Sequence, residues 1–300
     1  MAQIQVGEIL SGKSGQYRIE GEIARGGMGA IYQATRQSDQ ISVAIKEACL
    51  DPMFCEDPDT RQQVQTQLLR EMSVLQTLDH PNIPHIYDQF PSHQNEYLVM
   101  EYIAGCTLMQ ISQRAQRQHQ ILDESRVIGW TLQVLDALCY LHTLPTPVIH
   151  RDIKPENLIL TPDGRVVLVD FGLMKEVERK IEAAESYINT FGTLEYAPPE
   201  QFDEHGWGTD ARSDIYSLGA TIYYLLAGRL PPRAKDRVIA GLADYASGVS
   251  SIRPLNPSVS KTTDRVIAKA LEFDRRHRFQ TAQEMRSALL PPRRYILLPF

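Results

Sequence analysis

The chain has 300 residues, of which 43% are hydrophobic and 23% charged, as in an ordinary soluble globular protein. Its 31 basic and 37 acidic residues give a formal charge of −6, which argues against nucleic acid or an anionic membrane as the main partner. The sequence has no C-x-x-C pair, no secretory signal and no apolar stretch long enough to cross a bilayer. We therefore expect reduced thiols, no membrane segment and a cytoplasmic location.

The first notable segment, residues 7–14 (GEILSGKS), fits the P-loop pattern G-x-x-x-x-G-K-[ST] letter for letter. A P-loop needs a buried strand before it and a helix after it, because the phosphates bind at the helix N-terminus. Here a short polar terminus precedes the segment, and strand-like alternation follows from Tyr17. We therefore predict that residues 1–16 are a solvent-exposed lead-in and do not bind phosphate.

From residue 17 to residue 100 the pattern is mainly that of strands, with one helix. Ile41–Ile45 and Glu96–Met100 are compact runs of strand-forming residues. Between them, Val64–Leu78 carries apolar residues at helical spacing, and Pro81 cannot continue that helix.

After Gly105 the pattern changes to long helices, which we predict at 123–142, 212–227, 262–272 and 281–290, the first with Asp123 as its N-cap. In the middle of this part, Leu158–Leu160 and Val166–Val169 flank the turn signal TPDG and predict a small hairpin.

Two motifs stand on either side of that hairpin. Residues 150–157 read HRDIKPEN, and residues 170–172, which begin 13 positions after the end of the first motif, read DFG. Together they match H-R-D-x-x-x-x-N and D-F-G, the signature of the protein kinases, in the order and at the separation of that family.

The polar residues of these motifs have distinct roles in phosphoryl transfer within the family. The resemblance implies that Asp152 accepts the proton of the incoming hydroxyl and that Lys154 neutralises charge on the transferring phosphate. Asn157 and Asp170 would supply the hard oxygen ligands that Mg²⁺ prefers, with Mn²⁺ as the alternative ion.

The resemblance covers residues 17–290 and is especially close to the bacterial eukaryotic-like serine/threonine protein kinases. It implies an α+β, bilobal protein-kinase fold: a small β-rich N-lobe with one main helix at about 17–100, a hinge at 101–104, and a larger, mostly helical C-lobe at 105–290. Residues 291–300 would be a C-terminal tail.

Two segments of the N-lobe resemble the nucleotide-binding elements of the family. Residues 24–31 (ARGGMGAI) match the glycine-rich loop G-x-G-x-x-G-x-V except at its first glycine, where Ala24 stands, and at its valine. Residues 43–46 (VAIK) follow at the family's position. Glycines let the loop backbone approach phosphates without Cβ clashes. Lys46 would bind the α- and β-phosphates while paired with Glu71 on the helix.

Further ATP contacts follow from the same resemblance. Backbone groups of Glu101 and Ile103 would bind adenine, Met100 would limit the back of the pocket, and aliphatic side chains would sandwich the purine. The predicted ATP-binding residues are Ala24, Gly26, Gly27, Met28, Gly29, Ile31, Ala44, Lys46, Glu71, Met100, Glu101, Ile103 and Ile159.

The acceptor and the regulation can also be read from the motifs. Lys154 and the segment GTLEY at 192–196 are typical of serine/threonine kinases, and Thr193 would hydrogen-bond Asp152 and Lys154. Arg151 would hold a phosphorylated residue of the segment 170–200. The candidate acceptors there are Ser186, Tyr187, Thr190 and Thr193, with Ser186 and Thr190 preferred. Alternatively, an acidic residue of the same segment occupies Arg151, and no modification is needed; those candidates are Glu182, Glu185 and Glu195.

Three further residues are expected to hold the C-lobe together. Glu200 should be buried against Arg278, because an unpaired buried carboxylate is costly. Asp214 should accept backbone N–H groups of the catalytic loop.

The sequence therefore predicts an ATP-dependent kinase of protein serine and threonine residues that acts in signalling, with a second copy of the chain as a partner in autophosphorylation. A nucleotide-binding pseudokinase scaffold is one alternative, but it should lack one of Lys46, Asp152, Asn157 or Asp170, and all four are present. A small-molecule kinase of related fold is the other, and GTLEY and the PPE of 198–200 argue against it.

Overall fold

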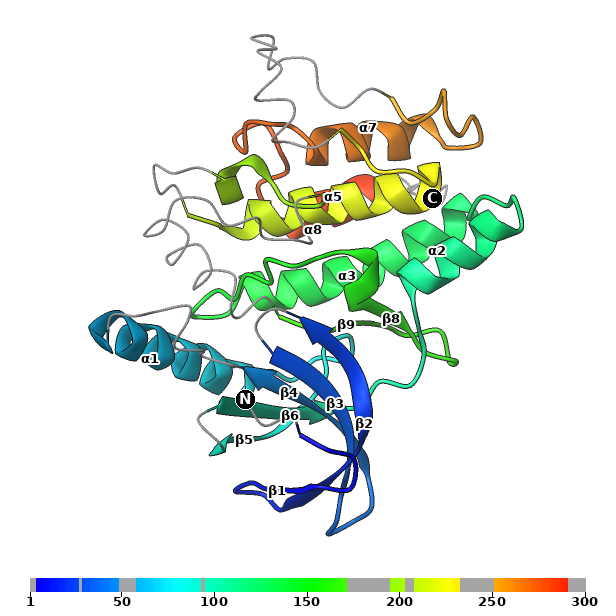
Figure 1. The fold of residues 1–300 in the computed structure, drawn as a ribbon. Helices are drawn as coiled ribbons and strands as arrows, with labels where there is room; N and C mark the ends of the chain where they lie inside the picture. The colour runs from blue at the N-terminus through cyan, green and yellow to red at the C-terminus, as the bar shows by residue number, and fades with distance from the viewer. Residues whose placement is uncertain are drawn as a thin grey trace, which may run out of the picture. The chain divides into compact units, whose positions relative to one another are not determined.

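The structure is a computed structural model that describes residues 4–26, 29–48, 58–92, 95–171, 195–202, 208–232 and 251–290. The described residues fall into two compact units (Figure 1). The first comprises the residues up to 105 together with 169–171, and the second comprises 106–168 and the described residues from 195 onward.

The first unit is built on a six-stranded antiparallel sheet of order β1-β2-β3-β4-β6-β5 (Figure 1). Its elements are β1 (Ile9–Ser11), β2 (Gln16–Gly26), β3 (Gly29–Arg36), β4 (Ser42–Ala48), α1 (Pro58–Leu75), β5 (Ile86–Ser92) and β6 (Asn95–Glu101). One face of the sheet is a continuous apolar core that includes Tyr17, Ile45 and Val99. Because side chains alternate along a strand, the residues between these core positions point to the opposite face.

Helix α1 covers more of the chain than its apolar pattern indicated. It begins at Pro58 rather than near Val64, because its first turn (PDTRQQ) has no apolar residue that could reveal the helical period. Proline is favoured at the first position of a helix, where its missing N–H costs nothing. Leu68, Met72 and Leu75 are among the apolar residues at helical spacing in this helix, and all three are buried.

The N-terminal segment differs from the predicted exposed lead-in, because residues 9–11 form β1 and Leu10 is buried. Asp88 on β5 explains how the segment is held. Its carboxylate accepts the Ser14 N–H at 2.7 Å and the Tyr17 hydroxyl at 3.1 Å. A Cβ at Gly12 would lie 2.3 Å from the same carboxylate. Residues 7–14 thus form β1 and a bend held against a buried carboxylate, and strand β2 follows them, as predicted.

The second unit is mostly helical, with one small sheet of order β7-β8-β9. Its elements are β7 (Cys106–Thr107), α2 (Leu108–Arg117), α3 (Glu124–His142), the short 3₁₀ helix η2 (Pro155–Asn157), β8 (Leu158–Leu160), β9 (Val166–Leu168), the 3₁₀ helix η3 (Pro199–Phe202), α5 (Ala211–Ala227), α7 (Lys261–Ala270) and α8 (Ala282–Leu289). Helix α3 packs against α5 and α8 (Figure 1).

Capping side chains place the starts of these helices. The Asp123 carboxylate accepts the Arg126 N–H at the start of α3, as predicted, and the Thr281 hydroxyl accepts the Glu284 N–H at the start of α8. None of the helices in the described part of the chain combines the length and the hydropathy needed to cross a membrane.

Candidate active site

The first unit gathers five of the predicted ATP-binding residues on one face of its sheet. In the strand register, Ile31 lies opposite both Ala24 and Lys46, and Ala44 lies opposite Met100. Residues that pair directly across antiparallel strands have their side chains on the same side. This face is the one opposite the apolar core.

The hairpin between β2 and β3 carries the glycine-rich loop. Gly26 pairs with Gly29 at its end, while Gly27 and Met28 lie outside the described residues. Gly29 has a φ of +139°, and a Cβ on it would lie 2.0 Å from the carbonyl oxygen of Glu47. Only glycine can therefore stand at this position without moving the neighbouring strand.

Lys46 has a different partner from the one predicted. Its ammonium contacts the Asp170 carboxylate and the Phe171 carbonyl oxygen, the latter at 3.1 Å. Among the described residues, which include both members, the predicted ion pair with Glu71 is not formed, and Glu71 accepts a hydrogen bond from Gln67 at 3.3 Å. One ammonium needs only a few acceptors, and residues 170–171 supply them here.

Asp170 also has an unusual backbone. Its φ is +61°, in the left-handed region that residues other than glycine rarely adopt. Such strain costs of the order of 1 kcal/mol and is concentrated at functional sites. The strained backbone presents the Asp170 carboxylate to Lys46.

The predicted adenine-binding segment begins at Glu101, the last residue of β6. The Glu101 N–H donates to the His85 carbonyl oxygen at 2.8 Å, and Ile103 is buried. Ile159, by contrast, belongs to the second unit, where it lies in β8 opposite Thr107 and Val167.

In the second unit the three predicted residues of the catalytic loop form one cluster. The Lys154 ammonium lies 3.0 Å from the Asp152 carboxylate. The Asn157 side-chain nitrogen donates to the backbone oxygen and to the carboxylate of Asp152, at 2.8 and 2.9 Å. Asp152 is only 6% exposed, so these contacts hold it in one orientation.

A completely buried carboxylate, Asp214 on α5, holds the chain that leads into Asp152. It accepts the N–H groups of His150 and Arg151 at 2.9 and 2.8 Å, as the sequence predicts. Arg151 has a φ of +65°, so the two bonds support a strained turn directly before Asp152.

His142, which no sequence motif singled out, is a further partner of Asp214, and its Nε2 lies 2.9 Å from the Asp214 carboxylate. Burial alone would raise the pKa of Asp214, but the His142 hydrogen bond and the neighbouring His142 and His150 hold that pKa below its usual value. The one signal for His142 was its position in the last turn of the predicted helix 123–142.

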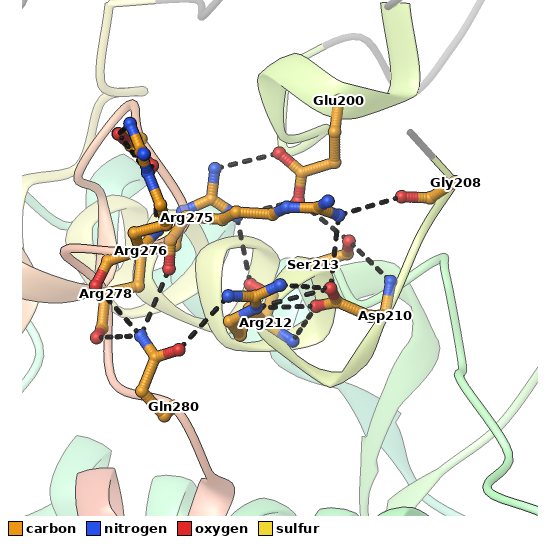
Figure 2. Close-up of polar contacts among 10 residues, drawn as sticks. Glu200, Gly208, Asp210, Arg212, Ser213, Arg275, Arg276, Arg278 and Gln280 are labelled. Carbon is orange, nitrogen blue, oxygen red and sulfur yellow. Dashed lines mark hydrogen bonds and ion pairs between the residues drawn. The ribbon is translucent and has the colours of Figure 1, made fainter. Parts of the chain in front are cut away.

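The predicted pair of Glu200 and Arg278 is formed and buried (Figure 2). The two guanidinium nitrogens lie 2.7 and 2.8 Å from the two carboxylate oxygens. Ser213 at the start of α5 donates to the same carboxylate at 2.8 Å. The pair therefore joins η3 to α5 and to the loop before α8 by charge-assisted bonds.

Comparison with known proteins decides the family. Residues 17–290 match the profile of the protein kinase domain. The chain belongs to the protein kinase family. It is 34% identical over 285 residues to the probable serine/threonine-protein kinase PknB of Lactococcus lactis, covering 94% of this chain and 42% of that protein. It is 31% identical over 279 residues to the serine/threonine-protein kinase PrkC of Bacillus subtilis, covering 92% and 41%.

The predicted resemblance to bacterial serine/threonine kinases is thus confirmed. The chain spans about two fifths of the length of these curated relatives. Among solved structures, the kinase domain of PknI from Mycobacterium tuberculosis matches with a TM-score of 0.70 at 24% identity, covering 96% of this chain and 98% of that one. This likeness confirms the predicted α+β kinase fold.

The regulatory predictions for this kinase domain concern mostly residues that the structure does not describe. Ser186, Thr190 and Thr193 lie outside the described residues. Arg151 lies within them, and its Nε donates to the Thr209 hydroxyl at 3.1 Å. A regulatory role for Arg151 stays a prediction.

Proposed function

We propose that this kinase domain transfers the γ-phosphate of ATP to serine and threonine hydroxyls of proteins in signalling, including those of another copy of itself. The observation that carries the proposal is the cluster around Asp152. A buried carboxylate held by a lysine and by an amide, on a strained turn, is arranged to accept a proton from an incoming hydroxyl. The names of several relatives support serine and threonine as the acceptors.

The other predicted residues complete the chemistry. Lys154 shares the Asp152 carboxylate and would screen charge on the phosphate as it moves toward the acceptor. Lys46 would hold the α- and β-phosphates beneath the glycine-rich hairpin. Ala24, Ile31, Ala44 and Met100 share the Lys46 face of the sheet and would contact the nucleotide base.

The predicted metal ligands suit a hard divalent cation. Both hydrogen bonds of the Asn157 side-chain nitrogen go to Asp152, which leaves the amide oxygen for a metal. Among the described residues the Asp170 carboxylate pairs with Lys46, and the contact uses one of its two oxygens. An amide oxygen and a carboxylate suit Mg²⁺ or Mn²⁺ better than zinc, which prefers Cys and His ligands. When bound, such an ion neutralises charge on the β- and γ-phosphates.

The place and partners of the reaction follow from the substrate. ATP is supplied in the cytoplasm, so we place the domain there, with protein substrates and a second copy of the chain as partners. The formal charge of −6 supports proteins rather than nucleic acid as those partners.

A transfer assay tests the proposal. Purified protein is incubated with γ-labelled ATP, Mg²⁺ and a generic protein acceptor, beside Asp152→Asn. Asp163→Asn makes the same chemical change in an exposed turn and is the matched control. We expect label on the acceptor with wild type and with Asp163→Asn, and almost none with Asp152→Asn.

Two other results would overturn the proposal. Nucleotide binding without any transfer would make the chain a pseudokinase scaffold. Transfer to a small alcohol and never to protein would make it a small-molecule kinase.

A further inference from the structure

Glu47 follows Lys46 on β4, and its side chain points to the opposite face of the sheet. It pairs in register with Tyr97 on β6, and it is only 8% exposed. A carboxylate is rarely buried on the core face of a sheet, because removing its charge from water costs free energy.

The Glu47 carboxylate is held by three donors. The Tyr97 hydroxyl and the Asn95 side-chain nitrogen each donate to one of its oxygens at 2.8 Å. The Tyr32 hydroxyl donates to the other at 3.3 Å. No ion pair of Glu47 is formed among the described residues, and these three donors compensate for the burial of its charge. A buried charge of this kind adds little net stability. The role of Glu47 therefore has to be sought in the segments that its hydrogen bonds connect.

The contact through Tyr32 continues into the glycine-rich hairpin. The Tyr32 hydroxyl accepts a hydrogen bond from Arg25 at 3.1 Å, and Arg25 forms an ion pair with Glu22 at 2.5 Å. Burial and the charge of Glu47 both raise the pKa of Tyr32, so its hydroxyl keeps the proton that it donates to Glu47. A continuous chain of polar contacts thus runs from the hairpin to β4.

The backbone of Glu47 holds the same hairpin from its other strand. Gly29 lies so close to the Glu47 carbonyl that a Cβ there would be 2.0 Å from that oxygen. The side chain of Glu47 therefore holds β2 through Tyr32 and Arg25, while its backbone abuts the start of β3. The residue next to Glu47 is Lys46, the predicted phosphate-binding lysine.

We propose that Glu47 is a positioning residue for phosphate binding: through Tyr32 and Arg25 it ties the glycine-rich hairpin to the strand that carries Lys46. This inference rests on the proposed function, since it assumes that the hairpin and Lys46 bind one nucleotide. Arg25 has a structural part in this arrangement and is held on the face opposite Lys46, away from a nucleotide on the Lys46 side. Without the contacts that run from Glu47 through Tyr32 to Arg25, the hairpin would lose conformational entropy when nucleotide binds, and this cost would weaken binding.

The test is Tyr32→Phe, with Tyr97→Phe as the matched control. Both changes delete one hydroxyl that donates to Glu47, and both tyrosines are 1% exposed, but only Tyr32 leads to the hairpin. The Kd for a non-hydrolysable ATP analogue with Mg²⁺ is measured by calorimetry, together with KM and kcat for ATP. Losing one such hydrogen bond should weaken nucleotide binding roughly three- to tenfold in Tyr32→Phe and raise KM for ATP by the same factor, with kcat nearly unchanged. Tyr97→Phe should leave both constants within about twofold of wild type.

Backbone amide hydrogen exchange gives a readout that needs no activity. Tyr32→Phe should speed exchange in residues 22–26 and 29–31 of the nucleotide-free protein, and Tyr97→Phe should not. Arg25→Met should add nothing to Tyr32→Phe in either measurement, because the two changes break one chain. Equal effects of the two tyrosine variants, or unchanged exchange in Tyr32→Phe, would overturn the inference. If the wild-type protein binds no nucleotide, but Tyr32→Phe still speeds exchange in residues 22–26 and 29–31, the proposed function is refuted. The structural link from Glu47 to the hairpin is then still supported.

Discussion

The Lys46 ammonium contacts the Asp170 carboxylate, although 124 positions separate the two residues in the chain. The contact joins the residue predicted to bind phosphates to one of the two predicted to bind metal. Replacing Lys46 by alanine would therefore free Asp170 and remove the phosphate contact at the same time.

We accordingly expect Lys46→Ala to lower kcat/KM for ATP by at least about a hundredfold, because misplaced phosphates lose their alignment with the acceptor. Lys13→Ala, at an exposed position, is the control. Steady-state kinetics decide the matter. A Lys46→Ala protein with near wild-type kcat/KM would show that another group binds the phosphates.

Breaking the buried pair of Glu200 and Arg278 should lower the stability of the fold far more than breaking an exposed ion pair. Removing one partner leaves the other charge buried and unpaired, so Arg278→Met should cost about 3–5 kcal/mol. Arg276→Met, which breaks the exposed pair with Asp274, should cost far less. Thermal unfolding midpoints compare the variants. A Glu200→Gln/Arg278→Met double variant should lose less stability than Glu200→Gln and Arg278→Met lose together. A loss in the double variant that equals the sum of the two single losses would contradict this prediction.

Asp214 predicts a loss of stability in acid. Its pKa is lowered from 3.8 in the folded protein, so the folded state favours the charged form. That contribution is present above the unfolded value, near pH 4, and it is lost as the pH falls toward the lowered pKa. Asp214→Asn should unfold more readily at neutral pH but show a flatter decline of its unfolding midpoint below pH about 4. Parallel declines in wild type and variant would exclude Asp214 as a source of acid sensitivity; Glu20→Gln, at an exposed position, is the control.

Phosphorylation of Ser186 or Thr190 should raise activity, since Arg151 can bind a phosphate with two hydrogen bonds. In the structure its Nε contacts Thr209, a weaker partner that a phosphate would displace. Mass spectrometry of protein made with and without Asp152→Asn identifies modified residues, and activity after phosphatase treatment measures their effect. An unmodified protein whose activity phosphatase does not change would favour the acidic residues as the occupants of Arg151.

The sequence predicted well the parts of the fold that depend on neighbouring residues, and the family resemblance implied two long-range contacts that are formed, the pair of Glu200 with Arg278 and the hydrogen bonds of Asp214 to the catalytic loop. Asp152, Lys154 and Asn157 lie within six positions, so the motif already implies their cluster. The capping role of Asp123 likewise depends on the next turn of the same helix.

Two of the differences arise where contacts join distant segments. Strand β1 has three residues, and the turn that follows it is held by Asp88, 74 positions beyond Ser14. The partner of Lys46 depends on whether the folded chain brings the carboxylate of Glu71 or that of Asp170 to its ammonium, and in the structure it is Asp170. Helix α2 was missed, although its apolar residues Leu108, Ile111 and Ala115 recur at helical spacing.

We propose that the Asp152 carboxylate serves the acceptor hydroxyl and does not hold the nucleotide. The most direct test of this proposal is the kinetics of Asp152→Asn with a peptide acceptor, measured as kcat and as KM for ATP. We predict that kcat falls by at least about a hundredfold while KM for ATP stays within about threefold of wild type. Near wild-type turnover in Asp152→Asn, or a loss confined to KM for ATP, would contradict the assignment of Asp152 as the catalytic base.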